Sequence, residues 1–118
     1  MTAKEADTDL TALHLAAKNN YVEVMSFLLE DSSTELEAKS AEIHRTPIHF
    51  AAESDSLDAV KLLLDKGVDV NCLDANESTP LHCAAESGAI KVVEFLINST
   101  KADQNLTNKF GYTPVKMT

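Results

Sequence analysis

Apolar positions recur with a helical period in three similar stretches of the chain. In "LDAVKLLLDK" the apolar residues Val60, Leu63 and Leu64 share one helix face, and charged residues stand opposite them. "YVEVMSFLLE" and "IKVVEFLINS" carry the same arrangement of apolar and polar positions. The pattern therefore predicts one amphipathic helix in each of the three stretches.

A shorter helix is predicted just before each of these stretches. The pattern Thr-x-x-His-x-Ala-Ala begins at Thr11, Thr46 and Thr79. Threonine is a good helix N-cap, and Pro47 and Pro80 occupy the first helical position, where a missing N–H costs nothing. Residues that tolerate a left-handed C-cap share one later column, which holds Asn20, Asp55 and Gly88. Each unit is thus predicted to be a short helix, a turn and a second helix.

The units follow one another at a nearly constant period. Thr113 begins a further copy, so that successive threonines are separated by 35, 33 and 34 residues. A period in this range indicates stacked repeats, in which each unit buries its apolar face only against its neighbours. About three repeats are the usual minimum for such a stack, and this chain reaches it.

Two of the units resemble ankyrin repeats. They read "TPLHCAAESGAIKVVEFLI" and "TPIHFAAESDSLDAVKLLLDKGVDVN", and the family pattern is Asp-x-x-Gly-x-Thr-Pro-Leu-His-x-Ala-Ala, a Val-rich second helix and Gly-Ala-Asp-Val-Asn. The resemblance implies an all-α ankyrin-repeat solenoid with short β-hairpin loops, here called fingers, at right angles to antiparallel helix pairs. We expect a single domain over residues 1–118. It would hold three full repeats, at approximately 6–40, 41–73 and 74–107, and a partial fourth repeat at 108–118.

The chain departs from the family pattern at the turn before each threonine. The family places glycine there, whereas this sequence has Gly111 in the last unit and Asp9, His44 and Glu77 in the others. Side chains other than glycine rarely adopt positive φ, and glutamate is the least suited of these three. Among these fingers, the second in particular is expected to be irregular.

Composition and charge restrict the classes of partner. Hydrophobic residues make up 44% of the chain and aromatic residues only 5%, which predicts a core of small and aliphatic side chains. The net charge of −9 would repel a phosphate backbone, so we expect neither nucleic acid nor a membrane as a partner. The chain has no apolar run of about 18 residues and no secretion-type N-terminus, which predicts an intracellular protein, cytoplasmic or nuclear. We also expect a monomer.

The repeated histidines do not have the spacing of a metal site. His14, His49 and His82 occupy equivalent helices about 8–10 Å apart, whereas zinc needs nitrogen ligands at about 2.0–2.1 Å. In ankyrin repeats, this histidine resembles a buried hydrogen-bonding post that ties the helix start to neighbouring loops. Cys83 follows His82 directly, and adjacent helical residues point about 100° apart, so this pair is not expected to act as nucleophile and base. We therefore predict no catalytic residue, no metal and no cofactor.

Both cysteines are expected to be reduced thiols. No secretion signal indicates an oxidising compartment in which Cys72 and Cys83 would pair. Cys83 also shares a column with Leu15 and Phe50, and that column is predicted to lie in the core. Cys72 is expected to be partly exposed.

Acidic residues gather around the fingers. Glu53 and Glu86 share one column, and Asp7, Glu42 and Glu77 lie nearby in the sequence of the fingers. One interpretation is a solvated surface. The other is recognition of a partner with basic or mixed charge, which such a strip would help to attract more than to hold. Both interpretations remain open at this point.

The resemblance implies that a partner protein docks on the finger tips and on the inner side of the first helices. The matching positions are Thr8, Leu10, Lys18, Asn19, Ile43, Arg45, Glu53, Ser54, Ala75, Asn76, Ser78, Glu86, Ser87, Lys109, Phe110 and Tyr112. Binding energy concentrates in a few apolar or aromatic groups, so the expected anchors are Leu10, Ile43, Phe110 and Tyr112. For Phe110 and Tyr112, packing within the finger is an equally open alternative.

Two functions follow from these observations. The first is a non-catalytic module that binds a partner protein on its concave face. The alternative is a structural spacer within a longer ankyrin array, of the channel or cytoskeletal adaptor type, without a partner of its own. One modification is also suggested, because "LLLDKGVDVN" resembles the context in which an oxygen-sensing dioxygenase hydroxylates ankyrin asparagines, here Asn71. A structural role, in which the Asn71 side chain bonds its own backbone, is compatible with this modification.

Overall fold

Six α-helices make up the regular structure of the described part of the chain. The structure is a computed structural model that describes residues 11–30, 36–41 and 43–114. The helices are α1 (Ala12–Lys18), α2 (Val22–Leu29), α3 (Pro47–Glu53), α4 (Leu57–Asp65), α5 (Pro80–Ser87) and α6 (Ile90–Ser99). The described residues contain no β-strand, so turns rather than strands form the fingers.

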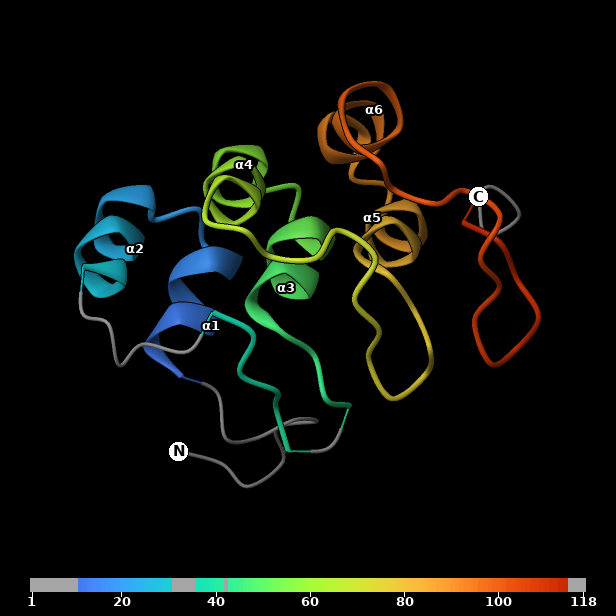
Figure 1. The fold of residues 1–118 in the computed structure, drawn as a ribbon, viewed down its shortest axis with the longest axis horizontal. Coiled ribbons are helices and arrows are strands. Elements are labelled where there is room, and N and C mark those ends of the chain that lie inside the picture. The colour runs from blue at the N-terminus through green and yellow to red at the C-terminus, as the bar shows by residue number, and fades with distance from the viewer. Residues whose placement is uncertain (1–10, 31–35, 42, 115–118) are drawn as a thin grey trace.

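The helices form two layers (Figure 1). The first helices α1, α3 and α5 pack side by side in one row, and the second helices α2, α4 and α6 form the other row. Each second helix packs against the first helix of its own pair, and the fingers project from the opposite side of the first-helix row. This arrangement confirms the predicted helical solenoid. The exact limits of each repeat stay a prediction.

Each first helix begins at the threonine of its repeat. In α1 the Thr11 hydroxyl accepts a hydrogen bond from the His14 backbone N–H at 3.2 Å, and in α5 Thr79 does the same for His82. These bonds satisfy one of the backbone donors that a helix start leaves unpaired. Proline occupies the first position of α3 and α5, as the sequence predicts. Because proline has no backbone N–H, it leaves no donor unpaired there.

Each first helix ends in a left-handed residue. The φ angles are 59° at Asn20, 57° at Asp55 and 74° at Gly88, which confirms the predicted left-handed column. Gly88 is itself the C-cap of α5, whereas Asn20 and Asp55 directly follow the C-caps Asn19 and Ser54. The next residue returns a backbone hydrogen bond to the helix, for example from the Tyr21 N–H to the Ala16 carbonyl at 2.9 Å. The tight turn directs the chain straight into the second helix.

Small side chains dominate the core between the first helices. The buried alanines of this row are Ala16, Ala17, Ala51, Ala52, Ala84 and Ala85. Larger apolar side chains fill the space between the two layers, and the fully buried ones include Leu13, Met25, Ile48, Val60, Leu63, Leu81, Val92 and Leu96. Alanine lets neighbouring helices approach closely, so the Ala-Ala pattern has a direct packing role. Within the described residues, every helix is too short or too polar to span a membrane.

Candidate protein-binding surface

The repeated histidines connect each repeat to the next finger. The ring nitrogen Nε2 lies 2.9 Å from a carbonyl oxygen of the following finger, which belongs to Arg45 for His14, Ser78 for His49 and Tyr112 for His82. The other ring nitrogen, Nδ1, accepts a hydrogen bond from the backbone N–H of the threonine that caps the same helix, at 2.9 to 3.2 Å. Because a carbonyl can only accept, Nε2 carries the proton and donates it.

These bonds make the histidines a structural ladder. All three are buried, and burial lowers the pKa of His49, which favours its neutral form. Both ring nitrogens are occupied by hydrogen bonds, as expected for a post that ties the helix start to a neighbouring loop. The ladder holds the fingers at fixed positions along the stack.

One group of potential metal ligands is present in the described part of the chain. His49, Asp74 and Cys83 are all buried, and their ligand atoms lie within 4.8 Å of one another. The Asp74 carboxylate already accepts bonds from two backbone N–H groups and from the Arg45 guanidinium. The positive Arg45 side chain beside this carboxylate disfavours a bound cation. Hydrogen bonding therefore explains why these side chains lie together.

Two fingers share one hydrogen-bonding pattern. In the finger of residues 74–78, the Asp74 N–H donates to the Ser78 carbonyl, and Asp74 Oδ1 accepts from the Asn76 and Ser78 N–H groups at 2.8 and 3.0 Å. Asn108 makes the equivalent bonds in the finger of residues 108–112. Glu77 adopts the positive φ of 59° that Gly111 provides at 84°. The glutamate finger is therefore regular despite its unfavourable residue.

Among the described fingers, the second is irregular. The Ser40 N–H donates to the Arg45 carbonyl, and the Arg45 N–H donates to the Ser40 hydroxyl, both at 3.0 Å. This closure spans one residue more than the closures of the other two fingers. His44 still takes a positive φ of 59°. A serine hydroxyl thus replaces the side-chain acceptor of the later fingers, which is the Asp74 carboxylate in one and the Asn108 amide oxygen in the other.

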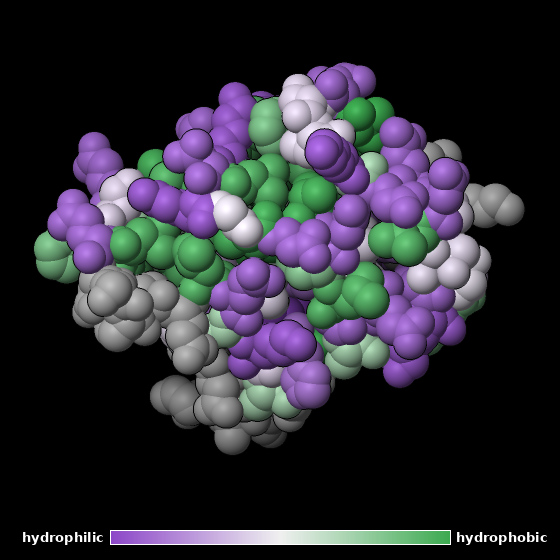
Figure 2. Space-filling view, in the orientation of Figure 1, coloured by the Kyte–Doolittle hydropathy of each residue, from purple (hydrophilic) through white to green (hydrophobic). Residues whose placement is uncertain are grey.

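Neighbouring fingers are joined through their backbones. The Ala75 N–H donates to the Ile43 carbonyl at 2.6 Å, and the Lys109 N–H donates to the Asn76 carbonyl at 2.9 Å. Together with the histidine ladder, these bonds make the described fingers a connected row. Figure 2 shows hydrophilic residues over much of the finger side, with separate hydrophobic residues among them.

Most of the predicted binding residues are exposed. They are Lys18, Asn19, Glu53, Ser54, Ala75, Glu86, Ser87, Lys109, Phe110 and Tyr112. Phe110 is 62% exposed and Tyr112 is 51% exposed, so neither aromatic side chain is covered by packing within its finger. Ile43 and Asn76 are half-buried, and Thr8 and Leu10 lie outside the described residues.

Two predicted binding residues have structural roles. Arg45 donates from Nε to Asp74 at 3.2 Å and from Nη1 to Glu53 at 2.8 Å, and its side chain is only 14% exposed. Ser78 is buried, and its backbone groups bind Asp74 and His49. The Arg45 ion pairs join the second finger to α3 and to the third finger, so these positions are internally constrained.

Asp74 is the residue that the sequence predictions missed. It anchors its own finger and pairs with Arg45, yet none of the predicted site residues includes it. A signal was present, because Asp or Asn before a turn commonly accepts hydrogen bonds from the backbone two residues on. The aspartate of the family pattern stands at this position.

Asn71 connects successive loops. Its side-chain Nδ2 donates to the Lys101 carbonyl at 3.2 Å, and its Oδ1 accepts from the Asp103 N–H at 2.8 Å. Its own backbone N–H donates to the Asp69 carboxylate. The side chain therefore binds the next repeat rather than its own backbone. Hydroxylation of Asn71 stays a prediction.

Both cysteines are free thiols in protected positions. Burial raises the pKa of Cys72 to about 11 and the pKa of Cys83 to about 12, so both are protonated at neutral pH. Cys83 and Phe50 are buried as predicted, but Leu15 in the same column is 47% exposed. The core prediction is therefore wrong for Leu15, because no preceding helix pair covers it among the described residues.

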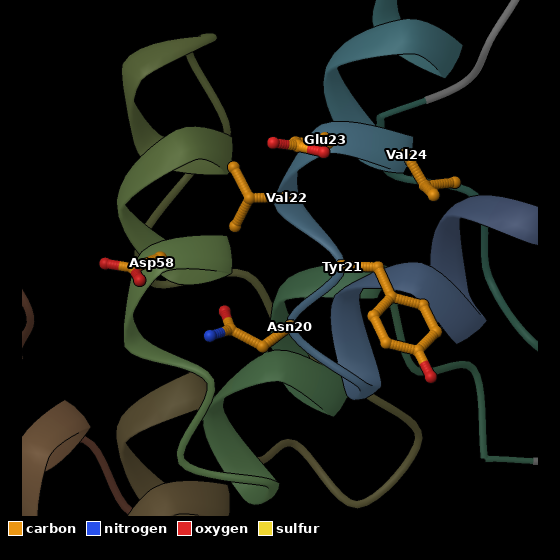
Figure 3. Close-up of a pocket in the computed structure, with 6 residues that line it drawn as sticks. All are labelled: Asn20, Tyr21, Val22, Glu23, Val24 and Asp58. Carbon is orange, nitrogen blue, oxygen red and sulfur yellow. The ribbon is translucent and has the colours of Figure 1, made fainter.

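A hollow of about 360 Å³ lies away from the fingers, between the first turns of α2 and α4 (Figure 3). The residues that line it are Asn20, Tyr21, Val22, Glu23, Val24 and Asp58. It contains two carboxylates but neither histidine nor cysteine.

A comparison with protein-family models identifies the architecture. The model described as ankyrin repeats, in three copies, matches residues 1–74 and 33–108. No curated protein matches the chain. The matches span most of the sequence and agree with the stacked helix pairs and the histidine ladder, and the chain therefore belongs to the ankyrin repeat family.

Proposed function

We propose that this protein is a non-catalytic module that binds a partner protein on its concave face. That face comprises the finger tips and the exposed side of the first helices. Ankyrin repeats are generally protein–protein interaction modules and are typically not catalytic. The observation that carries the proposal is the exposure of Phe110 and Tyr112 on a finger that internal bonds hold in place.

A fixed finger lowers the cost of binding. The Asn108 side chain accepts two backbone bonds within this finger, and His82 donates to its Tyr112 carbonyl. The aromatic side chains are therefore presented on a backbone that does not have to become ordered when a partner arrives. Such aromatic groups are common anchors in interfaces.

The charge of the same face favours a partner with basic or mixed charge. Glu77 and Glu86 are exposed without a salt bridge among the described residues, whereas Glu53 is paired with Arg45. Unpaired carboxylates on a chain of net charge −9 attract cationic groups over a distance of about 10 Å at moderate salt. This attraction would act mainly on the rate of association.

The anchors can be tested with one double variant and one control. Phe110→Ser with Tyr112→Ser should weaken a partner isolated from host extract by at least about 2 kcal/mol, or roughly 30-fold in Kd, measured by calorimetry. Ile90→Ser removes a side chain that is 67% exposed on α6, away from the fingers, and should leave the affinity unchanged.

Circular dichroism should show that both variants keep the helical stack. Unchanged affinity of the double variant would reject the finger face. Failure to isolate any protein whose capture depends on Phe110 and Tyr112 would favour the alternative, a spacer segment within a longer array.

A further inference from the structure

The Arg45 side chain occupies a site between the second and third fingers. Its Nη1 lies 2.8 Å from Oε1 of Glu53 on α3, and its Nε lies 3.2 Å from Oδ2 of Asp74 in the third finger. The side chain is only 14% exposed, so protein covers most of its surface. The second repeat therefore shows what this position offers to a cation, namely a carboxylate at the end of a first helix and a side-chain atom of the next finger.

The next repeat has the same backbone arrangement at this position but a short side chain. Ser78 precedes the capping threonine of its helix, as Arg45 does. The Arg45 N–H donates to Ser40 Oγ at 3.0 Å, and the Ser78 N–H donates to Asp74 Oδ1 at the same distance. The carbonyl oxygen of each residue accepts from a ladder histidine at 2.9 Å. Because the same bonds hold both backbones, the Ser78 side chain starts where the arginine side chain starts but ends at its hydroxyl group.

The carboxylate of the site is present in the third repeat without a cation. Glu86 stands in α5 where Glu53 stands in α3, at the same distance from the capping threonine. It is exposed, and neither Glu86 nor Lys109 forms a salt bridge among the described residues. A partner that covers Glu86 removes its water, and a carboxylate that loses water without gaining a positive charge opposes binding.

An amide donor replaces the second oxygen of the site. Asn108, in the finger of residues 108–112, is the equivalent of Asp74, and Oδ1 of each accepts from two backbone N–H groups of its own finger. The remaining side-chain atom of each therefore has the same direction, which in Asp74 takes Oδ2 to Arg45. Asn108 is only 5% exposed, and its Nδ2 has no hydrogen-bond partner among the described residues. A nearly buried donor without an acceptor indicates a ligand that supplies one.

The two groups together select the chemistry of the occupant. Glu86 requires a positive group, whereas the Asn108 N–H requires an acceptor. A metal ion would meet the hydrogens of the amide, and an anion would meet the carboxylate. An arginine residue supplies both needs, because its guanidinium pairs with a carboxylate and its peptide group offers a carbonyl oxygen.

We propose that the partner of the concave face places one arginine between the last two fingers, where its guanidinium pairs with Glu86 and a carbonyl beside it accepts from Asn108 Nδ2. The equivalent site one repeat earlier is filled by Arg45, so the partner's arginine is directed to the end of the face that carries Phe110 and Tyr112. This inference rests on the proposed function, to which it adds the chemistry of one contact and its place on the face.

The first test uses the full chain and N-acetyl-arginine methylamide, which carries a guanidinium beside peptide carbonyls. In heteronuclear NMR spectra, the side-chain amide signals of Asn108 should shift and reach saturation, with a Kd in the millimolar range that so small a ligand allows. The citrulline analogue has the same shape without the charge and should bind at least about fivefold more weakly. Glu86→Gln should weaken arginine binding to the same extent, whereas Glu94→Gln, at an exposed position of α6, should preserve it. The absence of a saturable shift, or an equal shift with citrulline, would overturn the proposal.

The second test moves the arginine into the chain. Ser78→Arg with Asn108→Asp gives the third repeat the groups that surround Arg45 in the second. In this variant, the further change Glu86→Gln should lower the thermal midpoint by more than about 3 °C, because it removes one side of an ion pair. In the natural chain, the same change should lower the midpoint by less than about 1 °C. Equal small effects in both chains would show that the site does not hold a guanidinium, and the proposal would be wrong.

The third test uses the partner that is captured through Phe110 and Tyr112. Glu86→Gln should raise its Kd by at least about tenfold, because the partner's arginine would lose its charge partner in a covered site, and Glu94→Gln should leave the Kd unchanged. If the aromatic double variant weakens the partner and Glu86→Gln does not, the proposed function stands and this inference fails. If neither variant weakens the partner, the proposed function fails as well.

Discussion

Both ring nitrogens of the buried His49 form hydrogen bonds, and this makes the stack sensitive to mild acid. Burial places the pKa of His49 below its ordinary value of 6.5, so the unfolded chain binds a proton more readily than the folded chain. The stabilising contribution is complete above pH 6.5 and is lost as the pH falls from there through the lowered pKa.

The expected result is a free energy of unfolding that falls below about pH 6.5, by at most about 1.4 kcal/mol per pH unit from this residue. Urea unfolding between about pH 7.5 and 5.5 measures it. His49→Gln should flatten this part of the profile, whereas His44→Gln, at an exposed finger tip, should preserve it. The same slope in the His49→Gln variant would contradict the assignment.

The positive φ of Glu77 gives a second prediction for a single residue. Glu77→Asn should raise the free energy of unfolding by about 0.5–1 kcal/mol, because asparagine adopts the left-handed conformation more easily. Glu86→Asn removes the same charge from a helix and should not stabilise the protein. Chemical denaturation of both variants makes the comparison, and equal effects would show that charge, not backbone conformation, is responsible.

The residues whose roles depend on local sequence could be predicted. Threonine and histidine three positions apart form a cap whichever repeat they occupy, and Asn20, Asp55 and Gly88 end their helices for conformational reasons alone. The pairing of Arg45 with Asp74 could not be predicted in this way. It joins two fingers 29 residues apart, and it depends on how adjacent repeats align in space.

At the level of elements, the third finger depends on one side chain. Asp74 combines two tasks, because Oδ1 holds the finger backbone and Oδ2 binds Arg45. Asn108 performs only the first task in the next finger. The two fingers therefore suggest a substitution that separates the tasks.

Asp74→Asn should keep the backbone bonds, lose the ion pair and lower the free energy of unfolding by about 1–2 kcal/mol. Asp74→Ala should lose both and cost about 3 kcal/mol or more, because buried donors are left unsatisfied. Asp65→Ala, at an exposed position near the end of α4, should change stability by less than about 0.5 kcal/mol. Equal costs for Asn and Ala at position 74 would contradict the two-task description. Urea titrations measure all three variants.

The order and limits of the helices were readable from caps and periodicity, whereas finger geometry was not. The second finger closes through Ser40 with one additional residue, and its irregularity follows from that closure rather than from an unfavourable φ angle. Glu77 shows the reverse case, because an unfavourable residue occupies a regular turn. Hydrogen bonds from the neighbouring fingers and from the histidine ladder offset that conformational cost. Such contacts between repeats cannot be predicted from the pattern of a single sequence.

For the whole molecule, net charge opposes compaction. A charge of −9 on 118 residues produces self-repulsion that salt screens. Raising NaCl from about 10 to 150 mM should therefore increase the free energy of unfolding, measured by thermal or urea unfolding. Glu23→Gln with Glu94→Gln, both exposed, should reduce this salt effect. A salt-independent stability would mean that attractive pairs such as Arg45 with Glu53 balance the repulsion.

The histidine ladder also determines where the chain can be truncated without the loss of a buried hydrogen bond. Each ring donates to a carbonyl that lies beyond the second helix of its own repeat, in the finger that follows. A truncation placed directly after α6 would strip His82 of its acceptor and leave a buried N–H unpaired, whereas one placed after residue 114 would retain it. The natural module for shuffling or shortening is consequently a helix pair together with the downstream finger.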